Sequence, residues 1–368
     1  MKFAVKREEF LKYAQLISGA VERRQTLPIL ANILISAHDN QILLTATDLE
    51  VELKARVSVD KIDDTGEITV NARKLIDICK TLPTDSNIGF STQKDRLLLK
   101  SGKSRFSLFT LNAHEFPNIE EAYSRLTISL LQRELKNLLE HTYFSMAQQD
   151  VRYYLNGMLI DINQGVMRVV TTDGHRLSLG NSNAICAKSE HIQIIVPRKG
   201  IIELMRLLED TENEIELRIG TNHICAMTSS FTFTSKLVEG KFPDYHKVIP
   251  KNGNKIVIVE RELLKQALIR VSILSNEKFR GVRLFISENL LKIFANNPEQ
   301  EEAEDEIEVN YNGAELEIGF NVNYLIDICN TITSNNLKMI FFDSDSSVLI
   351  ESDDEKGEFS YVVMPMRI

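Results

Sequence analysis

Two side chains in segment 171–177 could do chemistry together, because Asp173 and His175 stand two residues apart. A carboxylate beside an imidazole is the pairing of a general acid–base catalyst, so one interpretation is a hydrolase-like enzyme with its site there. The other interpretation is a turn at the end of a strand, since Asp-Gly is a common turn sequence. We favour the turn and expect no catalysis from these residues.

Motifs of known catalytic or metal chemistry are missing elsewhere in the sequence. It has no GxxxxGK[ST] loop, GxGxxG fingerprint, HExxH motif or GxSxG elbow, and its seven histidines lack metal-ligand spacing. The four cysteines form no close pair. Cys79 and Cys329 fall on matching helical patterns, where a small buried side chain in a reducing cytoplasm is expected. We predict a protein that is not an enzyme and holds no metal or cofactor.

A repeat with a spacing near 125 residues organises the chain. The pair Arg73-Lys74 returns as Arg198-Lys199, and the letters LIDIC occur at both 75–79 and 325–329. Units of this length can each hold their own hydrophobic core. We therefore predict three similar domains, which cover residues 1–125, 126–253 and 254–368.

The repeat also bears on the candidate acid–base pair. Asp173 has Asp48 as its counterpart, whereas His175 falls opposite Glu50. The carboxylate therefore belongs to the repeated scaffold, and the histidine is special to the middle repeat.

Two kinds of periodicity alternate within each repeat. Apolar residues at spacing 3–4 predict helices over 7–19 and 73–81, over 132–145 and 198–208, and over 261–273 and 322–332. Strict alternation of apolar and polar residues predicts strands, for instance over 42–47, 105–111, 157–162, 230–237 and 282–286. The prediction is an α+β fold in which each domain has two helices and antiparallel sheets.

Charge is distributed unevenly along a chain whose net charge is −9. Counting by predicted domain gives 18 basic and 17 acidic residues (+1), then 14 and 14 (0), then 11 and 21 (−10). The excess acid is concentrated in the run 299–308, and a basic stretch lies at 94–105. Such runs are often solvated edges. Opposite signs at opposite ends of a repeat array also suit a head-to-tail contact between two chains, which can close a ring.

Composition points to a globular protein without a membrane partner. The chain is 43% hydrophobic and 26% charged, and no apolar run is long enough to span a bilayer. The first ten residues alternate charge and lack the apolar centre of a signal peptide. We expect a cytoplasmic protein.

Several long stretches carry a family resemblance. Residues 26–30 (TLPIL), 149–157 (QDVRYYLNG), 171–177 (TTDGHRL), 196–200 (VPRKG), 242–245 (FPDY), 274–283 (LSNEKFRGVR), 296–304 (NNPEQEEAE) and 361–367 (YVVMPMR) resemble the bacterial β sliding clamps. These proteins are processivity factors of DNA replication, the beta subunits of DNA polymerase III. The resemblance runs from Met1 to Ile368. It implies three clamp domains per chain and a homodimer, joined head to tail as a ring around duplex DNA with helices lining the hole.

The resemblance implies a set of DNA contacts, which would be to phosphate and sugar and carry no sequence information. They are Arg24, Arg73, Gln149, Tyr153 and Tyr154. Without the resemblance, adjacent tyrosines would more often be packing residues. The predicted helices also carry basic residues that would face the hole, namely Arg7, Lys12, Arg73, Lys74, Lys80, Lys136, Arg198, Lys199, Arg206, Lys265 and Arg270.

The resemblance also implies one cleft for short linear peptides from the replicative polymerase, the clamp loader, other polymerases and repair proteins. It would be formed by Leu155, Thr172, Gly174, His175, Arg176, Leu177, Pro243, Val248, Asn321, Tyr324, Ser347, Val362, Met364, Pro365, Met366 and Arg367. Lys247 stands where the family often has arginine, and His246 beside it also differs.

Our prediction for the contact between chains pairs the basic stretch with the acidic run. Ile273 and Leu274 would supply its apolar centre, and ion pairs would surround it. One chain would contribute Lys74, Ile78, Leu82, Arg96, Lys103, Arg105, Phe106 and Leu108, and the other Ile273, Leu274, Glu299, Glu301, Glu302 and Glu304.

Overall fold

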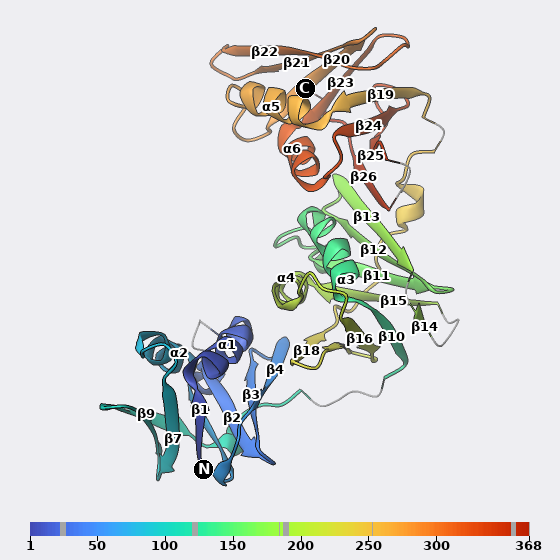
Figure 1. Cartoon of the computed structure of the whole chain (residues 1–368). Coiled ribbons are helices and arrows are strands. Elements are labelled where there is room, and N and C mark those ends of the chain that lie inside the picture. Colours follow the sequence, from blue (N-terminus) through green and yellow to red (C-terminus); the bar gives the residue numbers. More distant parts are fainter. Residues whose placement is uncertain are drawn as a thin grey trace. The chain divides into compact units, whose positions relative to one another are not determined.

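The computed structural model describes residues 1–22, 27–119, 124–183, 185–186, 191–251, 253–354 and 358–367 (Figure 1). Its internal contacts define two compact units. The first is built from Met1–Arg133, Ile185–Lys188 and Ile202–Leu237, and the second from Glu134–Ala184, Ser189–Ile201 and Val238–Ile368. None of the described helices is both long and apolar enough to cross a membrane.

The first unit is organised by a single antiparallel sheet of 14 strands, in the order β14-β10-β16-β17-β18-β4-β3-β2-β6-β9-β8-β7-β1-β5. Alternation places Ile42, Leu44 and Ala46 of β3 on the buried face, each with no exposed surface. The strands are β1 (Lys2–Lys6), β2 (Asn32–His38), β3 (Gln41–Thr47), β4 (Val51–Ser58), β5 (Ile62–Asp64), β6 (Gly66–Asn71), β7 (Asn87–Gln93), β8 (Arg96–Ser101), β9 (Ser104–Leu111), β10 (Leu126–Leu131), β14 (Ile185–Cys186), β16 (Glu214–Ile219), β17 (His223–Met227) and β18 (Phe231–Lys236).

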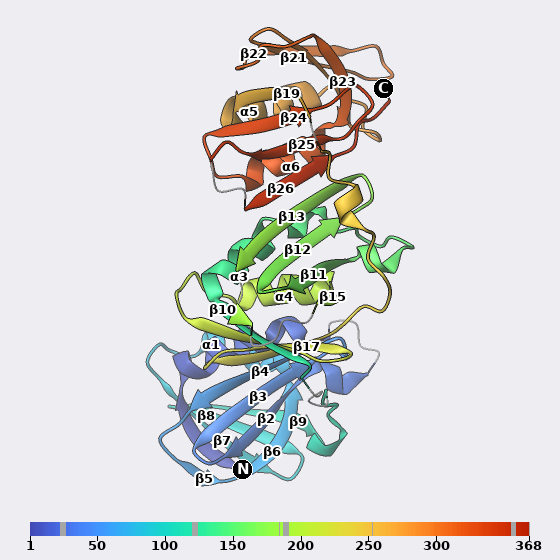
Figure 2. The same ribbon diagram turned by 90° about the vertical axis from the view of Figure 1, so that its right-hand side faces the viewer.

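The second unit contains an eight-stranded antiparallel sheet, β15-β11-β12-β13-β26-β25-β24-β19, and a four-stranded one, β22-β21-β20-β23. Figure 2 shows β12, β13 and β26 running side by side. The strands are β11 (Gly157–Asn163), β12 (Val166–Thr172), β13 (Arg176–Asn183), β15 (Ile192–Pro197), β19 (Lys255–Glu260), β20 (Gly281–Ser287), β21 (Leu290–Asn296), β22 (Glu302–Glu308), β23 (Leu316–Asn321), β24 (Asn336–Phe341), β25 (Val348–Ser352) and β26 (Phe359–Val363).

Helix pairs pack on these sheets in the predicted places. The pair of the first repeat is α1 (Arg7–Ile17) and α2 (Ala72–Thr81), and that of the third is α5 (Arg261–Ser272) and α6 (Val322–Thr331). The helices of the middle repeat are α3 (Gln132–Glu140) and α4 (Arg198–Leu207). Short 3-10 turns also occur, at Ser18–Ala20, Pro28–Ala31, Ala113–Glu115, Tyr143–Ser145, Tyr153–Leu155 and Tyr245–Lys247.

One tie between helices recurs in the first and third repeats. Arg7 Nε donates to the carbonyl oxygen of Cys79 at 2.9 Å, and Arg261 Nη1 donates to that of Cys329 at 3.1 Å. Both cysteines are buried as predicted, and burial raises the pKa of each thiol to about 12. The expectation that Arg7 faces the hole is wrong, because its guanidinium is used in this tie and only 15% of its side chain is exposed.

Helix α3 is shorter than the sequence predicts. The periodic pattern continues to residue 145, but the helix ends at Glu140. Thr142 Oγ1 donates to the carbonyl oxygen of Leu138 at 2.6 Å. Such back-bonding competes with helix continuation, and the chain passes into the 3-10 turn at Tyr143–Ser145.

Candidate functional site

The corner between β12 and β13 is a tightly hydrogen-bonded turn. Thr172 Oγ1 donates to the carbonyl oxygen of Arg176 (2.6 Å) and accepts the N–H of Gly174 (3.0 Å). Asp173 Oδ1 accepts the N–H groups of His175 (2.9 Å) and Arg176 (3.0 Å). Gly174 has φ +91°, which glycine adopts more readily than other residues. The turn favoured at this segment is therefore confirmed.

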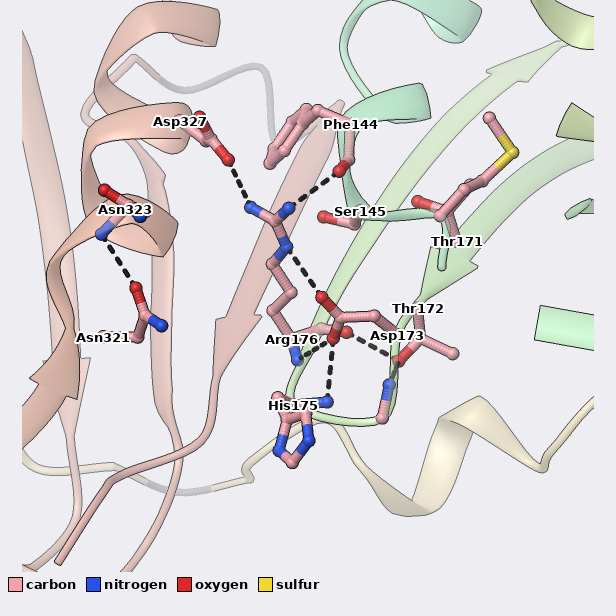
Figure 3. A network of polar contacts seen from close by, with 12 residues as sticks. Phe144, Ser145, Thr171, Thr172, Asp173, His175, Arg176, Asn321, Asn323 and Asp327 are labelled. Carbon is pink, nitrogen blue, oxygen red and sulfur yellow. Dashed lines mark hydrogen bonds and ion pairs between the residues drawn. The ribbon is translucent and has the colours of Figure 1, made fainter. Parts of the chain in front are cut away.

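Asp173 and His175 do not form an acid–base pair. The second oxygen of Asp173 accepts from Arg176 Nε at 3.1 Å, so both oxygens serve the corner (Figure 3). The His175 side chain is exposed, and no described residue hydrogen-bonds to its ring. The hydrolase interpretation is wrong, because the carboxylate that would orient the imidazole is already used by the backbone.

Arg176 connects this corner to helix α6 and to the 3-10 turn after α3. Its Nη1 atom lies 2.6 Å from Asp327 Oδ2, and its Nη2 atom donates to the carbonyl oxygen of Phe144 at 2.9 Å (Figure 3). The guanidinium carbon lies 4.5 Å from the centre of the Tyr324 ring and 5.3 Å from that of Phe144. Cation–π contacts combined with charged hydrogen bonds hold an arginine side chain more tightly than either alone.

A cavity of about 200 Å³ opens beside the corner. Its floor is apolar, because it is formed by Leu155, Leu177 and Val362, which are at most 3% exposed. Met364 stands at its rim, 40% exposed, and its N–H donates to the carbonyl oxygen of His175 at 2.9 Å. The full lining is Arg152, Tyr154, Leu155, Thr172, Gly174, His175, Arg176, Leu177, Phe242, Pro243, Tyr245, Val248, Val362 and Met364.

Four of these residues were not assigned to the cavity from the sequence: Arg152, Tyr154, Phe242 and Tyr245. Arg152 is held by Asp150, whose pKa it lowers to about 2 through hydrogen bonds and charge. Its Nη2 atom also donates to the carbonyl oxygen of Asp173 at 3.2 Å. These bonds attach the loop 148–155 to the corner. The FPDY motif at 242–245 is part of the family resemblance, and it could have indicated Phe242 and Tyr245 as cavity residues.

Six residues predicted for the cleft lie outside this lining. Asn321 caps helix α6 by accepting the N–H of Asn323 at 2.9 Å. The Tyr324 ring lies against the guanidinium group of Arg176, 4.5 Å from its central carbon. The N–H of Met366 donates to the carbonyl oxygen of Gly319 at 2.8 Å, which carries the chain end onto β23. Met366 and Arg367 line a separate hollow. Ser347 and Pro365 are partly buried and do not line the cavity.

The two unusual rim residues also lie outside the lining. Lys247 pairs with Asp244 at 3.3 Å, and the His246 ring lies 4.1 Å from that of Tyr245. Both are therefore neighbours of the cavity wall.

The described residues predicted to touch DNA are divided between the two units. Arg73 is the second residue of helix α2 in the first unit, 91% of its side chain is exposed, and it lies 3.8 Å from Asp77. Gln149 and Tyr153 belong to loop 148–155 of the second unit, where Tyr153 is 57% exposed. Tyr154 lines the cavity. Arg24 lies outside the described residues.

The residues predicted for the contact between chains lie on helix α2 and just after it, on strands β8, β9 and β22 and the turns beside them, and at the end of helix α5. Strand β9 pairs with β6 only at Leu111 and Thr110, so its residues 104–109 pair with β8 alone among the described strands. Strand β22 pairs with β21 alone in the described chain. Ile273 follows α5 and is 74% exposed, and Leu274 is partly buried.

The side chains on these edges differ in how much surface they offer. Phe106, Leu108 and Ile78 are partly buried, whereas Leu82 is only 6% exposed and packs within its own unit. Its burial leaves little surface for a second chain. The charged members Lys74, Arg96, Lys103, Arg105, Glu299, Glu301 and Glu302 are exposed, and Glu304 pairs with Lys292 at 2.6 Å.

Three family models match the chain in order. They describe the N-terminal, central and C-terminal domains of the DNA polymerase III beta subunit, at residues 1–120, 129–244 and 246–367.

Similar proteins and solved structures agree over the full length. The Beta sliding clamp of Pseudomonas putida is 53% identical over 368 residues, and that of Escherichia coli K12 is 51% identical, with 100% of each chain covered. The structure of the DNA polymerase III subunit beta from Pseudomonas aeruginosa has a TM-score of 0.98 at 52% identity, again with full coverage of both chains. The chain therefore belongs to the DNA polymerase III beta subunit family, the bacterial β sliding clamps, which are processivity factors and not enzymes.

Proposed function

We propose that this clamp tethers the replicative DNA polymerase to duplex DNA by holding a short peptide of the polymerase in the cavity beside the β12–β13 corner. The observation that carries the proposal is the apolar floor formed by Leu155, Leu177 and Val362 under a rim of polar groups. Such a cavity suits the apolar side chains of a short linear peptide, while the rim fixes its orientation. A structure of the Pseudomonas aeruginosa clamp bound to griselimycin supports the view that clamps of this family accept a ligand.

The same cavity would serve the clamp loader, other polymerases and repair proteins in turn. We expect a peptide with glutamine and leucine that ends in an apolar or aromatic residue to bind with micromolar affinity, because a flexible ligand loses conformational entropy on docking. Isothermal titration calorimetry tests this. Met364→Lys, or removal of the last five residues, should abolish binding while the oligomeric state stays unchanged. Retained affinity after the removal would place the docking site elsewhere.

We propose further that two chains join head to tail into a ring. Residues 104–109 of β9 pair with β8 on one edge and with no described strand on the other. This stretch carries Arg105 and is flanked by Lys103, and neither forms an ion pair with a carboxylate among the described residues. Strand β22 reads EAEDEIE and also has a free edge. An acidic edge strand of one chain and a basic edge strand of the other could add to one another as antiparallel strands, with Ile273 as an apolar anchor.

The ring would encircle duplex DNA without reading its sequence. Direct contacts through Arg24, Arg73, Gln149, Tyr153 and Tyr154 would be weak and salt-dependent. Sedimentation of the clamp, once loaded, with closed circular and with linearised DNA tests this topology. A ring should stay on circles and leave linear ends, whereas equal retention on both would contradict it.

We also propose that the three domains of the chain cover residues 1–125, 126–253 and 254–368, and that the protein is located in the cytoplasm.

A further inference from the structure

Asp161 of strand β11 is a buried carboxylate with three hydrogen-bond donors. It is 3% exposed, and its Oδ2 atom accepts from the hydroxyl of Tyr245 at 2.8 Å and from Gln193 Nε2 at 3.1 Å. Its Oδ1 atom lies 2.8 Å from His191 Nε2. Burial by itself would raise the pKa of this carboxyl, but the hydrogen bonds from Gln193, Tyr245 and His191 outweigh it, and the pKa is lowered.

Tyr245 contributes to the cavity at the other end of its side chain. The residue is 2% exposed, and it lines the cavity and packs in the core cluster with Leu155, Leu177 and Val362. Burial, followed by the hydrogen bond to Asp161, raises the pKa of its hydroxyl, so the group remains a donor. One side chain therefore joins the buried carboxylate to the wall of the cavity.

The hydrogen bond between Tyr245 and Asp161 attaches segment 242–248 of the cavity wall to strand β11. Phe242, Pro243, Tyr245 and Val248 all line the cavity and lie within eight residues of one another. The 3-10 turn in this segment is closed by local backbone bonds, from Lys247 to Asp244 and from Val248 to Tyr245. Among the described residues, the Tyr245 hydroxyl is the side-chain group of this segment that is hydrogen-bonded to the buried face of β11.

The other repeats lack this arrangement. At the position of Asp161 the first repeat has Ser36 and the third has Phe285, and the first repeat has Ile119 in place of Tyr245. In the first repeat the corresponding cross-strand pair is Ser36 with Glu67, whose Oε1 atom accepts from the serine hydroxyl at 2.8 Å. The carboxylate and the tyrosine therefore occur together in the repeat that has the apolar cavity.

We propose that Asp161 is a positioning residue for peptide recognition: through the hydroxyl of Tyr245 it sets the depth of the cavity that receives the last apolar side chain of the peptide. The inference rests on the proposed function, because it requires that the cavity binds a peptide. The tyrosine ring forms part of the wall, so a ring that is free to move changes which end residue fits best. Asp161 would thus act on selectivity as well as on affinity.

The test compares two peptides that differ only in their last residue, leucine or phenylalanine. Calorimetry gives the ratio of their dissociation constants for the wild-type clamp and for variants. Asp161→Ala removes the acceptor and should weaken binding by roughly tenfold and change the ratio at least about threefold. Tyr245→Phe keeps the ring but removes the donor, and it should change the ratio in the same direction. The double variant should show no further change, since both act on one contact.

Two variants separate positioning from general stability. Asp161→Asn keeps an oxygen that accepts from Tyr245 and should restore the wild-type ratio. Ser36→Ala removes the corresponding polar pair of the first repeat and should leave both dissociation constants unchanged. A lower melting temperature with an unchanged ratio in Asp161→Ala and Tyr245→Phe would overturn the inference. Failure of the wild-type clamp to bind either peptide would instead reject the proposed function itself.

Discussion

The corners at Thr47–Val51 and Thr172–Arg176 have the same backbone and different chemistry. In the first, Thr47 Oγ1 donates to the carbonyl oxygen of Val51 at 2.9 Å and accepts the N–H of Leu49 at 3.1 Å. Asp48 Oδ1 accepts the N–H groups of Glu50 (2.9 Å) and Val51 (2.8 Å). These are the bonds that Thr172 and Asp173 make in the middle repeat.

The strand beside each corner is also attached in the same way. The N–H of Lys236 donates to the carbonyl oxygen of Glu50, and that of Met364 to the carbonyl oxygen of His175, each at 2.9 Å. A hollow beside the first corner, of about 400 Å³, is lined by charged side chains that include Glu52, Lys54 and Arg218. The hollow beside the second corner has an apolar floor.

The difference is made by a few side chains on a shared scaffold. Where the second corner has Leu177, the first has Glu52, which is 2% exposed, accepts the N–H of Ile119 at 3.1 Å and pairs with Lys54 at 2.8 Å. A buried carboxylate with these partners leaves no apolar floor for a ligand. The scaffold residues thus keep the fold of the corner, and the residues after the aspartate decide whether the hollow beside it has the apolar floor that the proposed peptide site requires.

The largest expected effect comes from giving the second corner the acid of the first. Leu177→Glu places an unpaired carboxylate in the apolar floor, which should raise the dissociation constant of the peptide about 100-fold or more. Calorimetry measures the affinity, and the melting temperature separates lost binding from lost folding.

Glu52→Leu in the first corner is the matched control for Leu177→Glu. It should lower stability, because Lys54 and the N–H of Ile119 lose their partner, and leave peptide binding unchanged. A folded Leu177→Glu clamp that kept full affinity would show that the peptide does not enter this cavity.

Features of the fold that depend on local contacts could be predicted from the sequence. The corner was predictable because its signals are local: Asp-Gly follows a period-two strand, and its hydrogen bonds span at most four residues. Helices α2 and α6 were predictable for the same reason, since both copies of LIDIC carry a helical apolar pattern.

Contacts between distant segments were not predictable from these patterns. Arg176 pairs with Asp327 across 151 residues, and Tyr245 bonds to Asp161 across 84. The periodic pattern near Leu82 does not indicate that this residue is buried, because burial depends on which elements pack together. The end of α3 was missed because the apolar pattern continues past it, while the Thr142 side chain bonds back to the carbonyl oxygen of Leu138 and so competes with helix continuation.

A smaller effect is expected from Gly174→Leu, which gives the second corner the residue that the first has at 49. A Cβ atom at Gly174 would lie 2.9 Å from Arg152 Nη2, and the backbone φ of +91° disfavours any side chain. Arg152 must move from the rim, so peptide affinity should fall roughly tenfold and stability by about 1–2 kcal/mol. Calorimetry and urea denaturation measure both. Unchanged affinity would mean that Arg152 takes no part in the rim.

Alanine substitutions of the two corner aspartates, Asp48 and Asp173, should have a smaller effect on peptide affinity than Gly174→Leu. Asp48→Ala leaves two N–H groups without their acceptor and should destabilise the clamp by about 1–3 kcal/mol. Asp173→Ala should cost at least as much and also weaken peptide binding, since Asp173 Oδ2 orients Arg176 as well. Thermal unfolding and calorimetry on both variants test the distinction. Equal loss of peptide affinity in both would contradict the separate roles of the two corners.

The smallest expected effect is a gain in stability from Leu49→Gly. Leu49 holds φ 77°, in the left-handed region where a leucine side chain costs about 1–2 kcal/mol, and it is 39% exposed. Glycine relieves that cost but makes the unfolded chain more flexible and gives up some apolar contact, so the net gain should be below about 1 kcal/mol. Thermal unfolding of Leu49→Gly and of Leu49→Ala measures it, because alanine keeps the backbone strain while losing the contact. If the glycine variant is less stable than the alanine variant, the backbone strain at this corner costs less than the flexibility that glycine adds to the unfolded chain, because both variants lose the leucine contact. Backbone strain would then not explain the glycine at 174, and the crowding of Arg152 would be its cause.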